Sequence, residues 1–117
     1  FAYSSLKLSH TRISDKDSFT ASIELTNVGD REGTEVVQLY IRDIYSSATR
    51  PVKELKDFAR VTLKPGEKKT VTFTVTPDKL AYWNRNMQYG VEKGEFEIMI
   101  GSSSQDKDLK KVKMEVL

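Results

Sequence analysis

The chain has no cysteine and only one histidine among its 117 residues. The absence of thiols excludes disulfides, thiol chemistry and cysteine-based metal sites. The single histidine, His10, excludes a histidine-rich metal site and leaves any Ser-His-Asp triad one candidate base. His10 is flanked by Ser9 and Thr11 near the start of the chain, and we expect it on the surface. The sequence therefore predicts neither a metal centre nor a bound cofactor.

Long hydrophobic runs and a dominant sign of charge are also absent. The longest apolar runs are only a few residues, which is too short for a membrane-spanning helix. Lysine and arginine number 19, aspartate and glutamate number 17, and both signs are scattered along the chain. A net charge of +2 gives no basic surface of the kind that binds nucleic acid or membranes. We therefore expect neither nucleic acid nor a membrane as a partner.

What is present is the composition of one ordinary globular domain. Apolar residues make up 38% of the chain and charged residues 31%, which argues against disorder. A chain of this length buries roughly two-thirds of its unfolded surface, which is enough for one core. We therefore interpret residues 1–117 as a single domain. The chain starts at Phe1 rather than at methionine and shows no leader pattern, which we interpret as a fragment or a processed segment.

Short runs of alternating apolar and polar residues recur at intervals of about ten residues, the pattern of an all-β sandwich. In the clearest run, residues 18–28, the alternation predicts one buried face and one face in water. Threonine alternates as strictly in residues 68–77, where its β-branched side chain suits a strand. Six strands are expected in residues 3–9, 18–28, 34–44, 68–77, 94–103 and 110–117, with a seventh near residues 58–63.

Turn residues separate these runs. Two glycines and a polar cluster lie in residues 27–33, and another turn is expected just before Phe96. Pro65 and Gly66 occupy the two central positions of a type II turn. Residues 77–84 depart from the strand pattern, because Pro77 and the apolar residues after it suit one helical turn that crosses between sheets. The sequence thus predicts about seven antiparallel strands in two packed sheets.

Acidic residues are the main candidates for catalysis, because a glycosidase needs only two carboxylates on opposite sides of the scissile bond. Most of the 17 acidic residues lie in expected turns or at outward strand positions, where solvation explains them. Asp15 with Asp17, and Asp106 with Asp108, have a spacing sometimes found around calcium. Neither pair has the glycine and distal glutamate of a full calcium loop, so we interpret all four as polar turn residues.

The aromatic residues Tyr82, Trp83 and Tyr89 lie within one connection. Exposed aromatic rings are the stacking platforms on which carbohydrate-binding sandwiches hold sugar rings, so carbohydrate is a possible partner. The alternative is that the lone tryptophan fills the core or an interface, with its indole N–H hydrogen-bonded. Coplanar, exposed rings would favour sugar binding, and buried rings would exclude it.

Several motifs in order resemble one known family. The motifs are NVGDREGTEVVQLYIRD, SSATRPVKELKDFARVTLKPGEKKTVTFTV, LAYWN and VEKGEFEIMIGSSS. Together they are similar to the fibronectin type III-like domain that ends many family-three glycoside hydrolases, the β-glucosidase group. The resemblance runs from about Phe19 to Ser104, and the opening FAYSSLKLS is similar to the segment that follows the preceding domain in such enzymes.

The resemblance implies a fibronectin type III or immunoglobulin-like β-sandwich that is the carboxy-terminal part of a larger enzyme. In that family the catalytic aspartate belongs to an upstream barrel, and the acid/base glutamate to the barrel or to the domain after it. No catalytic motif of the family matches any position here, so no catalytic residue is carried over. The implied role is structural, with the upstream catalytic domains of the same polypeptide as the partner. The implied location is the periplasm or the outside of the cell.

Residues 50–67 carry both charge and large apolar groups at irregular spacing, which suits a surface that docks on a neighbouring domain. An arginine offers a bidentate fork, and Leu55 and Phe58 offer apolar anchors. The alternative is that Leu55 and Phe58 fill the core of the sandwich itself. The family commonly has glycine at the position of Asp57, whose carboxylate would change the contact. The expected contact residues are Arg50, Pro51, Lys53, Glu54, Leu55, Phe58 and, in addition, Trp83.

Overall fold

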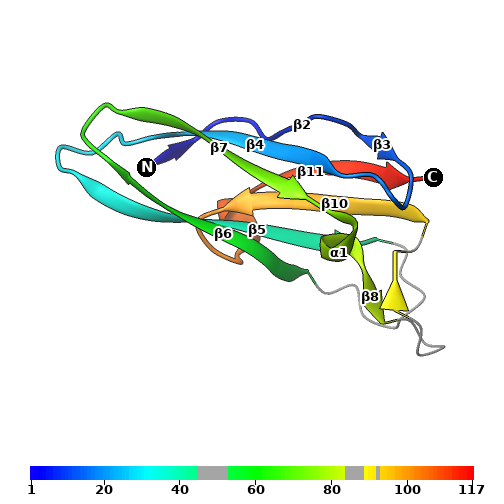
Figure 1. Ribbon diagram of the computed structural model, residues 1–117. Coiled ribbons are helices and arrows are strands. Elements are labelled where there is room, and N and C mark those ends of the chain that lie inside the picture. The colour runs from blue at the N-terminus through cyan, green and yellow to red at the C-terminus, as the bar shows by residue number, and fades with distance from the viewer. Residues whose placement is uncertain (45–52, 84–88, 92) are drawn as a thin grey trace.

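Two β-sheets pack face to face in the computed structural model, which describes residues 1–44, 53–83, 89–91 and 93–117 (Figure 1). The described residues contain one four-residue α-helix and one short 3-10 turn besides the strands. The predicted all-β sandwich is therefore confirmed. No helix of the described residues is both long and apolar enough to cross a membrane.

The first sheet is built around β4 (Phe19–Thr26). On one side β4 pairs with β7 (Lys68–Val75) along its whole length. On the other side it pairs with two short strands in succession, β1 (Ala2–Tyr3) and β2 (Lys7–Leu8). All these pairings are antiparallel, so the expected opening strand exists but is divided in two.

The second sheet has the strand order β3, β11, β10, β5, β6. Its neighbours are antiparallel except for β3, which pairs in parallel with β11. The strand β3 was not expected, because two residues are too short for an alternating pattern to be recognised. The bounds are β3 (Arg12–Ile13), β5 (Gly33–Asp43), β6 (Glu54–Leu63), β10 (Gly94–Gly101) and β11 (Leu109–Val116).

The predicted helical turn is α1 (Pro77–Leu80), which follows β7 and has proline at its start. After it, β8 (Tyr82–Trp83) and β9 (Tyr89–Gly90) pair as a two-stranded ribbon outside both main sheets. Figure 1 shows α1 and this ribbon together at one end of the sandwich. The second short helix, η1 (Asp106–Asp108), lies between β10 and β11.

The core lies between the two sheets and is formed by the inward-facing members of the alternating runs. In β4 every second residue from Phe19 to Leu25 is almost completely buried, as the sequence predicts. Burying one such side chain stabilises the fold by about 1.5–3 kcal/mol. The largest fully buried side chains are Phe96, Ile23, Leu25, Leu39, Leu63, Ile98, Met99, Ile100, Val37, Val75 and Val116.

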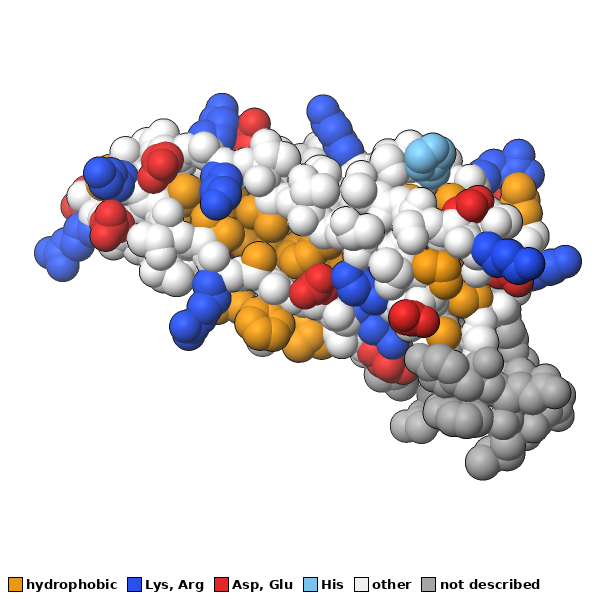
Figure 2. Space-filling view, in the orientation of Figure 1, with side chains coloured by type: hydrophobic (Ala, Val, Ile, Leu, Met, Phe, Trp, Pro, Cys, Tyr) orange, Lys and Arg blue, Asp and Glu red, His pale blue; other side chains and the backbone are white. Residues whose placement is uncertain are grey.

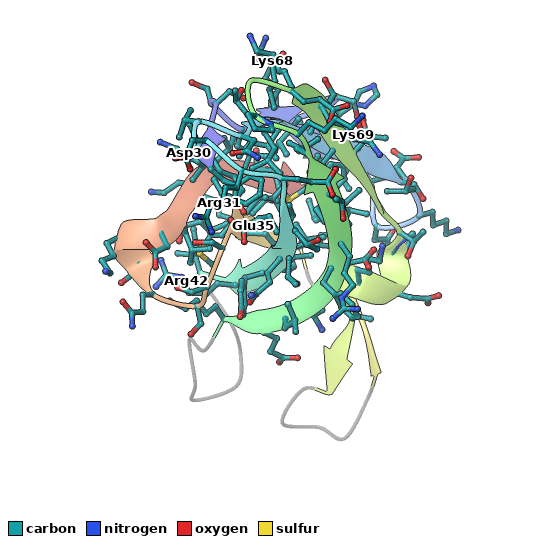
Figure 3. The ribbon with its side chains drawn as sticks, turned by 90° about the vertical axis from the view of Figure 1, so that its left-hand side faces the viewer. Asp30, Arg31, Glu35, Arg42, Lys68 and Lys69 are labelled. Carbon is teal, nitrogen blue, oxygen red and sulfur yellow. The ribbon has the colours of Figure 1, made fainter. Side chains whose placement is uncertain are left out.

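Two connections meet at the end of the sandwich opposite α1, and Figure 3 views this end with Asp30, Arg31, Lys68 and Lys69 around it. The β6–β7 connection is the predicted type II turn: Gly66 has φ 78°, and the N–H of Glu67 donates to the carbonyl of Lys64 at 2.9 Å. The N–H of Gly66 also donates to the carbonyl of Asn27 at 2.8 Å, which joins this turn to the β4–β5 connection.

Candidate docking surface

Strand β6 contains a β-bulge, and the bulge explains the irregular spacing of its apolar residues. Leu39 of β5 pairs with Asp57, but the next residue, Tyr40, pairs with Leu55, so Lys56 is the extra residue. Side chains three positions apart in a regular strand face opposite ways. Because Lys56 is inserted between them, Leu55 and Phe58 lie on the same face, opposite Tyr40 and Gln38 of β5.

That face is the outer one, because Gln38 and Tyr40 alternate with the core residues Val37 and Leu39. Leu55 is 51% exposed and Phe58 is 59% exposed. Neither fills the core of the sandwich. Figure 2 shows hydrophobic side chains at the surface along the part of the molecule that β6 forms.

The outward side chains of β6 continue past Phe58 to Arg60, which pairs across the sheet with Val36. We call Leu55, Phe58 and Arg60 the β6 row. All three side chains are exposed. The row lies on the last strand of its sheet, so it is bordered by β5 on one side only.

A loop covers the middle of the same outer face. Tyr40, Met99 and Leu109 form a small cluster there, separate from the main core, and they are 9%, 1% and 8% exposed. The loop of residues 102–108 crosses this cluster, since Gln38 Nε2 donates to the carbonyl of Ser102 at 3.0 Å and Asp106 bonds to Lys111 on one side of the cluster and to Lys53 on the other. The loop therefore covers the apolar part of the face beside β10 and β11 but leaves the β6 row open.

Gly101 allows the loop to approach this closely. A Cβ built on Gly101 would lie 1.9 Å from the carbonyl oxygen of Asp108, a distance that no side chain tolerates. Glycine is therefore required at this position by close backbone approach rather than by its φ angle. Within the loop, Ser103 Oγ donates to a carboxylate oxygen of Asp108 at 2.7 Å.

Asp106 holds the loop to the sheet through two lysines. Its Oδ1 atom accepts from Lys53 Nζ at 2.9 Å and from Lys111 Nζ at 3.1 Å. The hydrogen bond from Lys53, followed by that from Lys111, lowers the pKa of the Asp106 carboxyl below its ordinary value. Lys53 precedes β6 and Lys111 lies in β11, so Asp106 connects strands on opposite sides of the sheet across its outer face.

Two more ion pairs lie around the start of β6. Lys56 Nζ lies 3.1 Å from Glu54 Oε2, and Lys79 Nζ of α1 lies 2.9 Å from Asp57 Oδ2. The other oxygen of Asp57 accepts from the backbone N–H of Phe58 at 2.8 Å. Asp57 is on the inward side, opposite Leu39. An inward charge and a bulge both discourage an edge strand from pairing with another chain.

The expected contact residues are placed as follows. Lys53 lies just before β6, and Glu54, Leu55 and Phe58 lie in its first half, with both apolar side chains exposed to water. Lys53 is already bonded to Asp106. Arg50 and Pro51 lie outside the described residues, and so does the side chain of Trp83, although its backbone belongs to β8. The side chains of Tyr82 and Tyr89 are outside them too.

The other charged candidates are turn residues, as interpreted from the sequence. Asp17 Oδ2 accepts from the N–H of Ser14 at 3.0 Å, and hydrogen bonds from Ser14 lower the pKa of Asp17. His10 is exposed and bonds to its neighbour Ser9. Within the described ranges, no three carboxylate or imidazole groups come close enough to hold a metal ion.

Among the described residues, Tyr3 of β1 is the group whose pKa is shifted most. Burial raises the pKa of its phenol well above the ordinary value, and the nearby carboxylate of Glu35 raises it further. Glu35 follows the start of β5 and pairs with Val61, on the inward side of the sheet (Figure 3). The phenol is thus held neutral at the margin of the core and is not part of the outer face.

A family model described as "fibronectin type III-like domain" matches residues 35–104, more than half of the chain. The chain belongs to this family. The matched residues include most of β5 and all of β6, β7 and β10, and so both the β6 row and the start of the 102–108 loop.

Among known relatives of this fibronectin type III-like chain, the periplasmic β-glucosidase of Salmonella typhimurium is 45% identical over 104 residues, which are 89% of this chain and 14% of that protein. A β-xylosidase of Formosa agariphila is 47% identical over 116 residues, 99% of this chain and 16% of that protein. The crystal structure of a mutant β-glucosidase of Listeria innocua with laminaribiose matches 99% of this chain and 16% of that one, with a TM-score of 0.87 and 34% identity.

The resemblance inferred from the sequence motifs is therefore confirmed, and the chain spans about a seventh of the curated relatives it matches. Arg60 is a residue of the outer face that the sequence did not single out, and Asp106 was considered there only as a possible calcium ligand and interpreted as a turn residue. The sequence feature that could have revealed the outer face is the spacing of Leu55 and Phe58. Two residues three positions apart share one face of a strand only if a bulge lies between them. No sequence pattern marks the ion pairs that Asp106 makes with Lys53 and Lys111, because they form only when the loop folds over the sheet.

Proposed function

We propose that the chain is a non-catalytic accessory module of a β-glucosidase-type glycoside hydrolase, and that it packs on the catalytic part of the same polypeptide and stabilises it. The observation that carries the proposal is the open β6 row, where Leu55 and Phe58 are more than half exposed. The relatives support it, because in each of them the matching segment is a small part of a longer glycosidase.

The exposure of Leu55 and Phe58 suggests a partner surface, because the fold covers the other large apolar side chains of the same face by itself. On the same outer face, the 102–108 loop shields Tyr40, Met99 and Leu109 from water. Leu55 and Phe58 have no such cover in the described residues. About half of each side chain is still exposed, so covering the rest would contribute about 1–2 kcal/mol to an interface for each of them. Exposed apolar groups rimmed by charge are typical of interaction sites.

The charges around Leu55 and Phe58 suit an interface of this kind. Lys53, Lys56 and Lys79 each have an acidic partner within the chain, at 2.9, 3.1 and 2.9 Å. A charge that is already paired costs less to cover with another protein surface than a free one. The apolar anchors are therefore framed by charges that need no new partner. Arg50, Pro51 and Trp83 remain expected contacts of the same interface.

The test compares one substitution in two settings: the 117-residue chain by itself and the longer enzyme that contains it. We expect Phe58→Ser to leave the melting temperature of the chain by itself unchanged, because Phe58 is exposed there. In the longer enzyme it should lower both the melting temperature and the activity on a small aryl glucoside. The loss corresponds to about 1–2 kcal/mol of interface stability, because only the exposed part of Phe58 is newly covered.

Val28 supplies the matched control. It is 67% exposed and lies in the β4–β5 connection, at the end of the sandwich away from α1. Val28→Ser removes a similar exposed apolar group, and we expect it to be neutral in both settings. Equal behaviour of Phe58→Ser and Val28→Ser in the longer enzyme would contradict the proposal.

Carbohydrate binding through Tyr82, Trp83 and Tyr89 would give a different result in the same enzyme. The comparison is the enzyme with and without residues 1–117. If removing them lowers only the rate on a polymeric substrate, and leaves the melting temperature and the activity on a small substrate unchanged, the module binds carbohydrate and does not stabilise the enzyme.

The proposal also includes residues 1–117 as one domain at the carboxy-terminal end of the enzyme. The periplasmic relative supports a periplasmic or secreted location.

A further inference from the structure

Arg60 is the member of the β6 row whose charge has no acidic partner among the described residues. Its outward neighbours are Phe58, two positions before it on the same strand, and Val36, which it faces across the sheet. Glu35, the acidic residue next to Val36, lies on the opposite side of the sheet. The guanidinium therefore stands beside the apolar anchors with its donors available.

We propose that Arg60 pairs with a carboxylate on the catalytic part of the same polypeptide, at the edge of an apolar recess that receives Leu55 and Phe58. This inference rests on the proposed function and specifies the chemistry of the partner surface. Among the described residues, the basic side chains around the start of β6, Lys53, Lys56 and Lys79, are paired within the chain, so Arg60 is the described charge that is left to set the register of docking. The partner is the longer polypeptide itself, since the matched relatives extend far beyond this segment.

Arginine is suited to this role for geometric reasons. Its planar guanidinium makes two parallel hydrogen bonds to one carboxylate, which fixes orientation as well as distance. An apolar neighbour such as Phe58 shields the ion pair from water when the interface closes, and shielding strengthens the pair. A lysine at the same place would keep the charge but lose the fork, so it should replace arginine only in part.

The test again compares the longer enzyme with the 117-residue chain by itself, at low and high salt. In the longer enzyme we expect Arg60→Met to lower the melting temperature at both salt concentrations, with a somewhat smaller effect at high salt, because a partly shielded ion pair at the edge of the recess is screened only in part. Arg60→Lys should recover part of the loss. In the chain by itself, wild type and all variants should have the same melting temperature, because Arg60 is exposed.

Arg31 provides the matched control, since it is an exposed arginine in the β4–β5 connection, at the end of the sandwich viewed in Figure 3. Arg31→Met makes the same charge change away from the β6 row and should be neutral. If Arg60→Met matches Arg31→Met while Phe58→Ser still destabilises the enzyme, the carboxylate partner is refuted and the accessory role stands. If Phe58→Ser is neutral as well, the accessory role itself is wrong.

Discussion

At the scale of single residues, Asn27 is the polar side chain that the described part of the chain buries, with 3% of it exposed. Its Nδ2 donates to the carbonyls of Arg31 and Leu63 at 2.8 and 2.9 Å, and its Oδ1 accepts from the N–H of Gly29 at 2.9 Å. Its backbone N–H and carbonyl bond to Glu67 and Gly66. One side chain thus satisfies the backbone of two connections that meet at one end of the sandwich.

We expect Asn27→Ala to destabilise the chain by about 1–3 kcal/mol, because the buried carbonyl of Leu63 would lose its donor and a buried backbone group without a partner costs about that much. The quantity to measure is the free energy of unfolding in urea. Asn27→Asp keeps the acceptor for Gly29 but loses both donors, so it should also be destabilising. Asp30→Ala, an exposed change in the same connection, is the control and should lie near the wild type. A wild-type stability for Asn27→Ala would show that the two connections hold without it.

At the scale of elements, the 102–108 loop and strand β6 divide one sheet face between them. The position of the loop depends on the close approach of the Asp108 backbone to Gly101 and on the ion pairs of Asp106 with Lys53 and Lys111. Strand β6 is fixed by its pairing with β5 and by the bulge at Lys56. The link from Asp106 to Lys53 joins the two elements, so the loop helps to hold the entry of β6 and the anchors that follow it.

The titration of Asp106 gives this link a pH dependence with a definite sign. The folded-state pKa of Asp106 is lowered, so its contribution to stability is complete above the unfolded pKa, at about 4, and is lost as the pH falls through the folded value. We expect wild type and Asp106→Asn to differ in unfolding free energy at neutral pH and to converge in acid. The measurement is urea unfolding across this range.

Lys53→Met should raise the pKa of Asp106, as followed by NMR of its carboxyl carbon, because the hydrogen bond from Lys53 is the largest cause of its lowering. Asp15→Asn, another exposed acidic turn residue, is the control for a general charge effect. A constant difference between wild type and Asp106→Asn down to the most acidic pH would show that the carboxylate charge does not hold the loop.

At the scale of the whole molecule, the alternation of apolar and polar residues was enough to predict the sandwich, because a long strand with one buried face shows this alternation in its own sequence. This holds for β4 along its whole length and for β7 from Thr70 onward, where apolar and polar residues alternate. It fails for β6, where the face of Leu55 depends on the pairing of Tyr40 in another strand. The same limit applies to β3, whose partner β11 lies about a hundred residues away in the sequence.

The outer face was predicted only in part for a related reason. Leu55 and Phe58 were recognised as large apolar groups among charges, but the sequence left open whether they face the core or the water. Their exposure follows from one inserted residue, Lys56, whose effect appears only when the register of β5 and β6 is known. The partners of Asp106 come from β11 and from the residue before β6, and spacing along the chain does not reveal such contacts.

The relatives extend the proposed function to a prediction about specificity. One is a β-glucosidase and another a β-xylosidase, yet they are 45% and 47% identical to this chain over similar lengths. If the segment stabilises the enzyme and does not contact the sugar, exchanging residues 1–117 for the matching segment of the β-xylosidase should change the stability of the enzyme but not its preference between glucosides and xylosides. We therefore expect the ratio of activities on an aryl glucoside and an aryl xyloside to stay constant, even where both activities fall through imperfect docking. Measuring the ratio separates this effect from loss of enzyme, because inactive protein lowers both rates equally. A shift of the ratio toward the xyloside would place residues of this module at the sugar and would contradict the accessory role.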